Sequence, residues 1–182
     1  MADLVPNCVL GHLPGHGVSD LSDATVDGWS KAFAVAAGTY FGDRPVILAG
    51  ESLGALVCIG MGRFRLPAFR AVVAIEPPLT PSWPVRRAAL TEPMATMLRR
   101  PYDDILAACA LPLTVVAGDV PLEPEREMSL SPSLVSEAER TAHKPIVVSG
   151  GHQLLTENPE ACAILLREAA KHIDQPAAAT DA

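Results

Sequence analysis

The sequence has no long hydrophobic run and carries a deficit of positive charge. No apolar stretch approaches the ~20 residues that a helix needs to cross a bilayer, so we expect no membrane partner. Lysine and arginine total 14 against 21 acidic residues, which gives a net charge of −7. Because an acidic chain is repelled by phosphate backbones, we expect no nucleic-acid partner either.

Cysteine is also scarce, and the four that are present form no CxxC motif. They lie in apolar contexts, which is typical of reduced core thiols in a cytoplasmic protein. The first residues lack the basic start of a signal peptide, so we expect a cytoplasmic localisation. No cysteine–histidine cluster has metal-ligand spacing, and no glycine-rich phosphate loop follows a strand. We therefore expect no metal and no cofactor. The cysteines are Cys8, Cys58, Cys109 and Cys162.

Short apolar runs alternate with helical patterns along the chain. We expect one domain over residues 1–182, with a flexible tail at 174–182. Apolar runs without polar alternation indicate a mostly parallel sheet of about five or six strands, covered by helices on both faces in a three-layer α/β sandwich. The expected strands are 7–12, 45–50, 71–76, 111–119 and 145–151. The expected helices are 23–41, 53–64, 131–144 and one starting near Asn158, with further helical character in 77–110.

A serine between two glycines joins the second of these strands to the next helix. Residues 50–54 read Gly-Glu-Ser-Leu-Gly. Glycines two before and two after the serine would let the helix pack closely on the sheet, and the serine would project from a strained turn. The pattern predicts that Ser52 is a nucleophile and that the N–H of Leu53 stabilises an oxyanion.

A serine nucleophile needs a base and an orienting acid. His152 follows the last predicted strand and is the favoured base, because His143 and His172 fall in helical patterns. Asp119 follows the fourth strand and is the favoured acid. Glu76, at the end of the third strand, is the alternative, and Glu123 is a third candidate. His12 and His16, which follow the first strand, could shape the pocket.

Five segments together resemble the α/β-hydrolase superfamily over roughly residues 7–172. They are LPGHGVSD, VILAGESLGALV, AVVAIEPP, LPLTVVAGD and SGGHQLLTENPEACAILL. The resemblance implies the chain order serine, acid, histidine.

The same resemblance suggests a small, N-terminally shortened member of that superfamily. The loop that usually gives the second oxyanion donor would then be missing. Either the region of Gly11 and His12 or that of residues 15–17 replaces it, or the oxyanion hole has one donor. We expect His12 as this donor and Gly11, His16 and Glu51 as substrate-binding residues. Residues 77–110 would form a short, lid-like segment.

These features predict a serine hydrolase that cleaves an ester, thioester or similar acyl bond in a small-molecule substrate through an acyl-enzyme on Ser52. Two alternatives stay open. One is an acyltransferase or lyase on the same fold. The other is a catalytically weak or inactive scaffold protein that binds a partner. The open sheet edge of a shortened member could also mediate formation of a homo-oligomer.

Overall fold

The computed structural model describes residues 4–13, 25–81, 92, 94–120, 132–171 and 173. The predictions made for His16, Glu123, His172 and the tail at 174–182 lie outside these residues.

The described residues form one sheet of four parallel strands in consecutive order, β1-β2-β3-β4. The strands are β1 (Val46–Glu51), β2 (Phe69–Ile75), β3 (Leu113–Gly118) and β4 (Ile146–Val148). In the register, Glu51 pairs with Ile75, Ile75 with Val116, and Gly118 with Val148. The carboxyl ends of all four strands therefore meet at one edge, where ligands bind in open parallel sheets.

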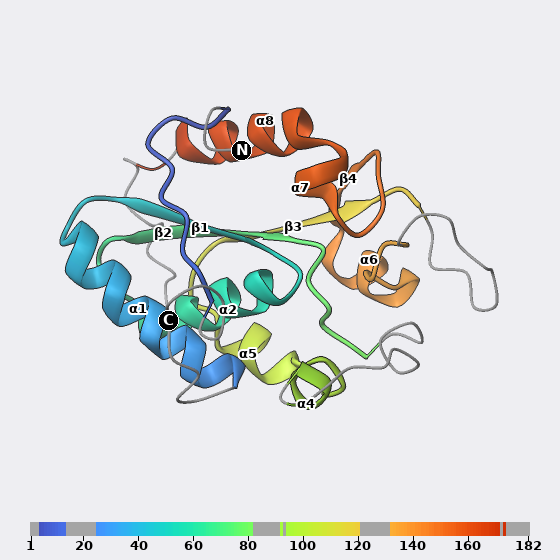
Figure 1. Cartoon of the computed structure of the whole chain (residues 1–182), viewed down its shortest axis with the longest axis horizontal. Helices are drawn as coiled ribbons and strands as arrows, with labels where there is room; N and C mark the ends of the chain where they lie inside the picture. The colour runs from blue at the N-terminus through green and yellow to red at the C-terminus, as the bar shows by residue number, and fades with distance from the viewer. Residues whose placement is uncertain are drawn as a thin grey trace.

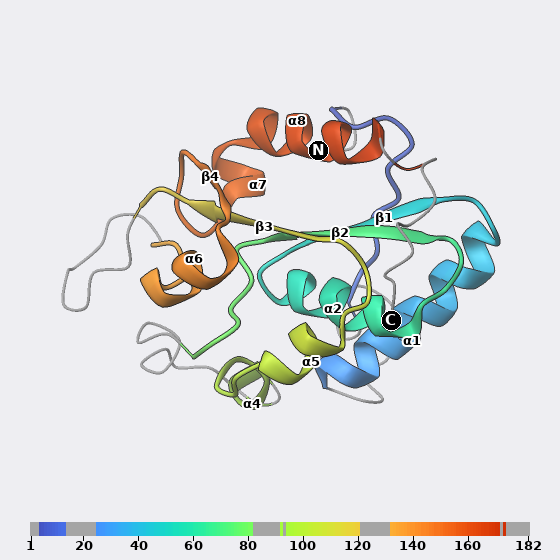
Figure 2. The same ribbon diagram turned by 180° about the vertical axis from the view of Figure 1, so that it is seen from behind.

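Helices cover both faces of this sheet, so the predicted three-layer α/β architecture is confirmed (Figures 1 and 2). One face carries α1 (Val26–Phe41), α2 (Leu53–Met61), α4 (Met94–Leu98) and α5 (Asp103–Ala108), with the short 3₁₀ helix η1 (Gly62–Phe64) following α2. The other face carries α7 (Leu154–Glu157) and α8 (Pro159–Lys171), and α6 (Glu137–His143) lies beside the carboxyl end of the sheet.

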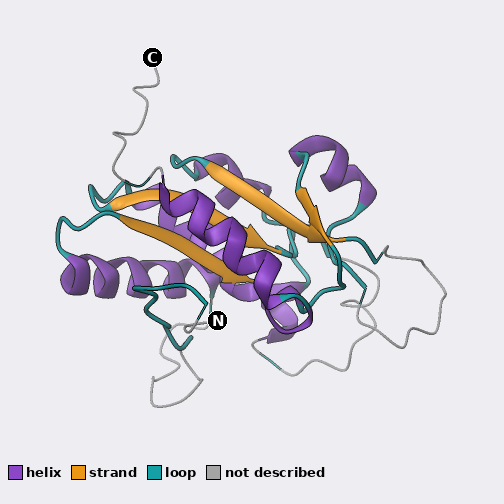
Figure 3. Cartoon of the chain, turned by 90° about the horizontal axis from the view of Figure 1, so that it is seen from above, coloured by secondary structure: helices purple, strands orange, loops and turns teal. Residues whose placement is uncertain are grey.

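Two hydrophobic clusters lie on opposite sides of the sheet. Side chains alternate across β2, so Val72 and Ala74 pack on the α1–α2 side while Val73 and Ile75 pack on the α8 side. Figure 3 shows the strands side by side with a helix lying across them. Because helices cover both faces of the central strands β2 and β3, these strands are mainly apolar without alternation, as the sequence indicated.

The expected strand at 7–12 is wrong. These residues form a loop, and Val9 and Leu10 are 53% and 66% exposed. Asn7 has a positive φ of 59°, which an extended strand does not accommodate. The run is apolar, but in the described part of the chain it makes no backbone hydrogen bonds to a neighbouring strand. Without such bonds it is not part of the sheet.

The described helices of the segment 77–110 pack into the core on the α2 side of the sheet. Met97, Tyr102 and Ile105 are buried in the same cluster as α2. The views agree that α5 lies beside α2 and that α4 lies next to α5, on the same side of the sheet as α1 and α2. These helices therefore belong to the core, and a lid-like role for the segment 77–110 stays a prediction.

Candidate active site

Ser52 occupies the sharp turn between β1 and α2. Its backbone has φ 54° and ψ −122°, a conformation that non-glycine residues rarely adopt. Its N–H still donates to Ile75 O at 2.9 Å, which ties the turn to β2, and its carbonyl accepts from Ala55 N at 3.0 Å. The turn is thus held from both sides, and the hydroxyl projects at the carboxyl edge of the sheet.

Gly50 makes this close turn possible. A Cβ added to Gly50 would lie 2.3 Å from Gly54 O, which is backbone and cannot move aside. A Cβ added to Gly54 would meet no described atom within 4 Å. The expectation that both glycines relieve a collision is therefore right for Gly50, whereas Gly54 takes part only through its backbone.

His152 reaches Ser52 across 100 residues of sequence. The imidazole Nε2 lies 2.9 Å from Ser52 Oγ, within hydrogen-bond distance. The side chain is 19% exposed, so it lies at the surface edge of the site. The structure therefore brings together the predicted nucleophile and the predicted base.

Glu76, and not Asp119, faces the other side of this imidazole. Glu76 Oε2 is 3.4 Å from His152 Nδ1, and Glu76 is fully buried. No hydrogen bond joins Asp119 to His152. Instead, Asp119 Oδ1 accepts from Gly150 N at 2.9 Å. The alternative acid, Glu76, is therefore the one that contacts the imidazole, and the reason lies in the strand order. The catalytic role of either acid stays a prediction.

The strand order places Glu76 under the imidazole. The loop after β4 must cross the ends of β3 and β2 to bring His152 to Ser52 at the end of β1. Asp119 follows β3 and meets the first part of that loop, whereas Glu76 follows β2 and meets its tip. Glu76 also has a positive φ of 50°, so a second non-glycine residue at this edge adopts a rare backbone conformation.

The Glu76 carboxylate is fully satisfied by donors that the sequence did not reveal. Oε1 accepts from Gly118 N and from Ser133 Oγ, each at 2.6 Å, and Oε2 accepts from Leu134 N at 2.7 Å. A carboxylate that accepts from the imidazole requires the proton on His152 Nδ1. The Nε2 atom is then free to accept the Ser52 hydroxyl proton. A serine before a helix carries no distinguishing sequence signal, so Ser133 could not have been selected.

The loop that carries His152 is anchored by several side chains. Glu157 accepts the Gly151 N–H, and Asn158 Nδ2 donates to Ser149 O at 3.0 Å. Glu51 Oε1 accepts from Leu155 N at 2.8 Å. Burial raises the pKa of the Glu51 carboxyl above its usual range, and the Leu155 N–H partly opposes this. Glu51, expected to bind substrate, is seen to connect β1 to α7.

Comparison with solved structures gives a consistent picture of the fold, whereas no family model and no curated protein sequence matches the chain. A thioesterase domain from the curacin biosynthetic pathway superposes with a TM-score of 0.61 at 18% identity, covering 85% of this chain and 78% of the other. A thermophilic esterase from Thermogutta terrifontis gives 0.63 at 17% identity, with 88% and 78% covered. An alpha-beta serine hydrolase homologue from Coxiella burnetii gives 0.52 at 18% identity, with 86% and 66% covered. This chain has the α/β-hydrolase fold.

Within the α/β-hydrolase fold, the predicted second oxyanion donor has no described link to Ser52. Gly11 lies against α1, where an added Cβ would be 2.4 Å from Phe33 Cε1. His12 is exposed and shares no hydrogen bond with Ser52 or His152. The N–H of Leu53 lies at the start of α2, next to Ser52. The roles of Leu53, His12 and Gly11 stay predictions.

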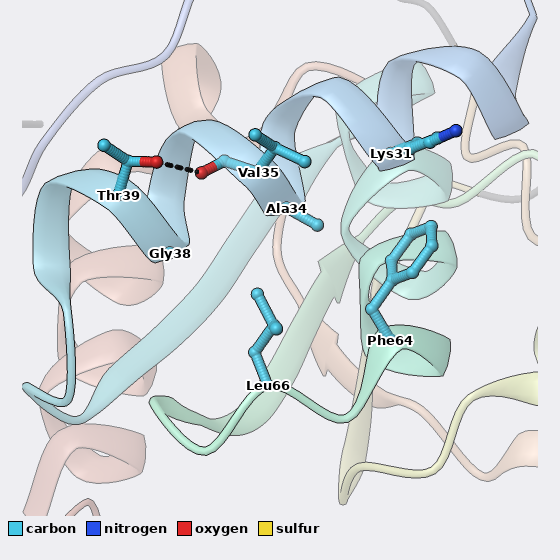
Figure 4. A pocket seen from close by; sticks show the side chains of 7 residues that line it. All are labelled: Lys31, Ala34, Val35, Gly38, Thr39, Phe64 and Leu66. Carbon is cyan, nitrogen blue, oxygen red and sulfur yellow. Dashed lines mark hydrogen bonds between the residues drawn. The ribbon is translucent and has the colours of Figure 1, made fainter.

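A hollow of about 370 Å³ lies away from the site, between α1 and the segment that follows α2 (Figure 4). Ser52, Glu76 and His152 do not line it, so we assign it no part in the candidate chemistry. Its lining residues are Lys31, Ala34, Val35, Gly38, Thr39, Phe64 and Leu66.

Two searches of the described residues found nothing. No group of three or more histidine, cysteine or acidic side chains is arranged to hold a metal ion. None of the helices in this part of the chain is long and apolar enough to cross a membrane.

Proposed function

We propose that this protein is a serine hydrolase that cleaves an ester, thioester or similar acyl bond in a small molecule. The observation that carries the proposal is the line of three side chains from Ser52 Oγ through the His152 imidazole to the Glu76 carboxylate, with separations of 2.9 and 3.4 Å. In unliganded sites such hydrogen bonds are often loose, and they tighten when substrate binds. The similarity of the fold to a thioesterase domain and an esterase supports the same reaction class.

In the proposed reaction, His152 Nε2 takes the hydroxyl proton as Ser52 Oγ attacks the substrate carbonyl. Glu76 keeps the proton on Nδ1 and stabilises the imidazolium that forms. The N–H of Leu53 donates to the oxyanion, where the positive end of the α2 dipole also helps. Nε2–H then protonates the leaving group, and the acyl-enzyme on Ser52 remains. Water, deprotonated by the same nitrogen, releases the acid.

A fluorophosphonate probe and short p-nitrophenyl esters test this proposal. The wild-type protein should be labelled once, on Ser52, and should hydrolyse p-nitrophenyl acetate. Ser52→Ala should abolish labelling, and both Ser52→Ala and His152→Ala should lower kcat by about 10⁴-fold or more. Ser149→Ala and His143→Ala are matched controls, because Ser149 is an exposed serine of the same loop and His143 lies on α6. Both controls should keep the wild-type rate.

The same experiment separates the alternatives. Labelling of Ser52 without ester hydrolysis, followed by turnover when an alcohol or amine acceptor is added, would indicate an acyltransferase. A protein that is neither labelled nor active on any ester would contradict the hydrolase proposal and leave the scaffold alternative.

A further inference from the structure

A second polar cluster lies directly behind the Glu76 carboxylate. Ser133 is fully buried there, and Arg140 reaches it from α6. Arg140 Nη2 donates to Ser133 Oγ at 2.7 Å and to Gly118 O at 2.6 Å. Arg140 Nε donates to Val135 O at 3.1 Å. The guanidinium therefore joins α6 to the end of β3 and to the loop that precedes α6.

The hydrogen bonds of Ser133 leave its hydroxyl only one orientation. A serine hydroxyl has one proton to donate and two lone pairs that accept. The lone pairs receive Arg140 Nη2–H and, at 3.3 Å, Val135 N–H. The single O–H must then point to Glu76 Oε1, which lies 2.6 Å away. Without Arg140, this hydroxyl could turn and donate elsewhere.

Both donors to Glu76 Oε1 among the described residues are connected to the same guanidinium. One is the Ser133 hydroxyl, and the other is the N–H of Gly118, whose carbonyl accepts from Arg140. With Oε1 fixed in this way, Oε2 is held toward His152 Nδ1. We propose that Arg140 is a positioning residue that acts through Ser133 to hold the Glu76 carboxylate against His152. This inference rests on the proposed function for the role of Glu76 in turnover, although the geometry that it describes is independent of turnover.

Four variants test the proposal: Arg140→Gln, Ser133→Ala, the double variant, and Arg63→Gln. The control Arg63→Gln removes an arginine whose ion pair with Asp27 lies on α1 and η1. The first readout is kcat and KM for p-nitrophenyl acetate. The second is the low-field proton NMR resonance of the His152 Nδ1–H that is hydrogen bonded to Glu76, assigned by its loss in Glu76→Gln and His152→Ala.

Arg140→Gln should lower kcat about 10-fold with KM within about twofold, because the contact acts on a group used in the chemical step. The low-field resonance should broaden or vanish. When Ser133→Ala is already present, adding Arg140→Gln should lower kcat by less than about threefold. The reason is that the Ser133 hydroxyl, which links Arg140 to Glu76, is already absent. If Arg140 had a purely structural role, Arg140→Gln would lower thermal stability equally with and without the Ser133→Ala substitution. Its effect on kcat would then also be the same in the two cases. Arg63→Gln should change neither readout.

Several results would overturn the inference. These are a folded Arg140→Gln variant that keeps the wild-type kcat and resonance, equal losses of kcat with and without Ser133, and a wild-type spectrum without the resonance. If Arg140→Gln does not fold, Ser133→Ala decides, and a wild-type kcat and resonance in that variant overturn the proposal. If the wild-type protein hydrolyses no ester, the proposed function fails alone. The inference is then supported when the resonance is lost in Arg140→Gln but not in Arg63→Gln, and overturned when Arg140→Gln retains it.

Discussion

Two acidic residues, Glu76 and Asp119, follow neighbouring strands at the carboxyl edge of the sheet, yet their surroundings differ completely. Glu76 is 0% exposed and accepts from two backbone N–H groups and a hydroxyl. Asp119 is exposed, and its carboxylate accepts from the backbone of the histidine loop. A buried, fully hydrogen-bonded carboxylate beside an imidazole can hold one tautomer, whereas Asp119 supports the loop.

Substitution of these two acids by their amides should therefore have opposite consequences. Glu76→Gln should lower kcat by about 10⁴-fold, because an amide cannot accept from every donor around it and the wrong imidazole tautomer results. Asp119→Asn should stay within about threefold of wild type, since its side-chain oxygen can still accept from Gly150 N. Steady-state kinetics on p-nitrophenyl acetate measure both. An active Glu76→Gln variant together with an inactive Asp119→Asn variant would return the acid role to Asp119.

The structure supports only in part the prediction that the four cysteines are reduced thiols of the core. None of them forms a disulfide, but Cys162 alone is buried, and the other three are half-buried. Burial, with a smaller contribution from the Glu51 charge, raises the pKa of the Cys162 thiol to about 11. Its thiolate, the reactive form, is therefore scarce near neutral pH.

At the scale of elements, the turn between β1 and α2 is defined by how closely the helix approaches the strand. The backbone of Gly54 occupies the space that a Cβ on Gly50 would need. The start of α2 could not move away without carrying Leu53, Leu56 and Ile59 out of the core. The glycine before the serine is thus fixed by packing.

Alanine at the two glycines tests this asymmetry. Gly50→Ala should destabilise the fold by about 3 kcal/mol or more, since overpacking against backbone forces the strand and helix apart. Gly54→Ala should be neutral or stabilising by up to about 1 kcal/mol, because alanine is the better helix former. Urea unfolding followed by circular dichroism gives both values. Equal destabilisation by the two substitutions would show that Gly54 also needs the space.

Two helix starts show how far a local cap can be recognised in the sequence. The last helix begins where the sequence indicated, and Asn158 Oδ1 accepts from Ala161 N at 3.3 Å. The helical pattern at 131–144 is shorter in the structure, where α6 starts at Glu137 after a capping box between Ser136 and Glu139. The residues before that cap are the ones that turn back to bind Glu76.

At the scale of the whole molecule, two core clusters share one sheet, and the single-domain prediction can be tested through their cooperativity. Ile59 is fully buried on the α2 side, and Leu154 is fully buried on the α8 side. Ile59→Ala and Leu154→Ala should each cost about 2–5 kcal/mol of unfolding free energy. If both clusters belong to one domain, each variant should show one unfolding transition at lower temperature, and the two losses should add.

A matched control for these core variants is Ile164→Ala on α8, where the side chain is 51% exposed and the cost should be within about 0.5 kcal/mol. Differential scanning calorimetry provides the measurement. Two separate transitions, each moved by only one of the substitutions, would contradict a single domain.

The two outer strands bear on the prediction of a homo-oligomer. In the described part of the chain, β1 and β4 each pair with one neighbour only. Ile146 and Val147 on β4 are 43% and 55% exposed. Open edges with apolar side chains are suited to pairing with another strand, so association between copies stays a prediction for sedimentation analysis.

The sequence by itself determined the parallel sheet, the position of Ser52 in its turn and His152 as its partner. These depend on local signals, namely apolar runs, a glycine before a strand-to-helix turn, and a histidine just after a strand. Only the tertiary structure placed Glu76 rather than Asp119 against the imidazole, and only it brought Ser133 and Arg140 behind Glu76. Such contacts depend on which strands are neighbours and on how far the histidine loop reaches across the sheet, and no spacing along the chain contains that information.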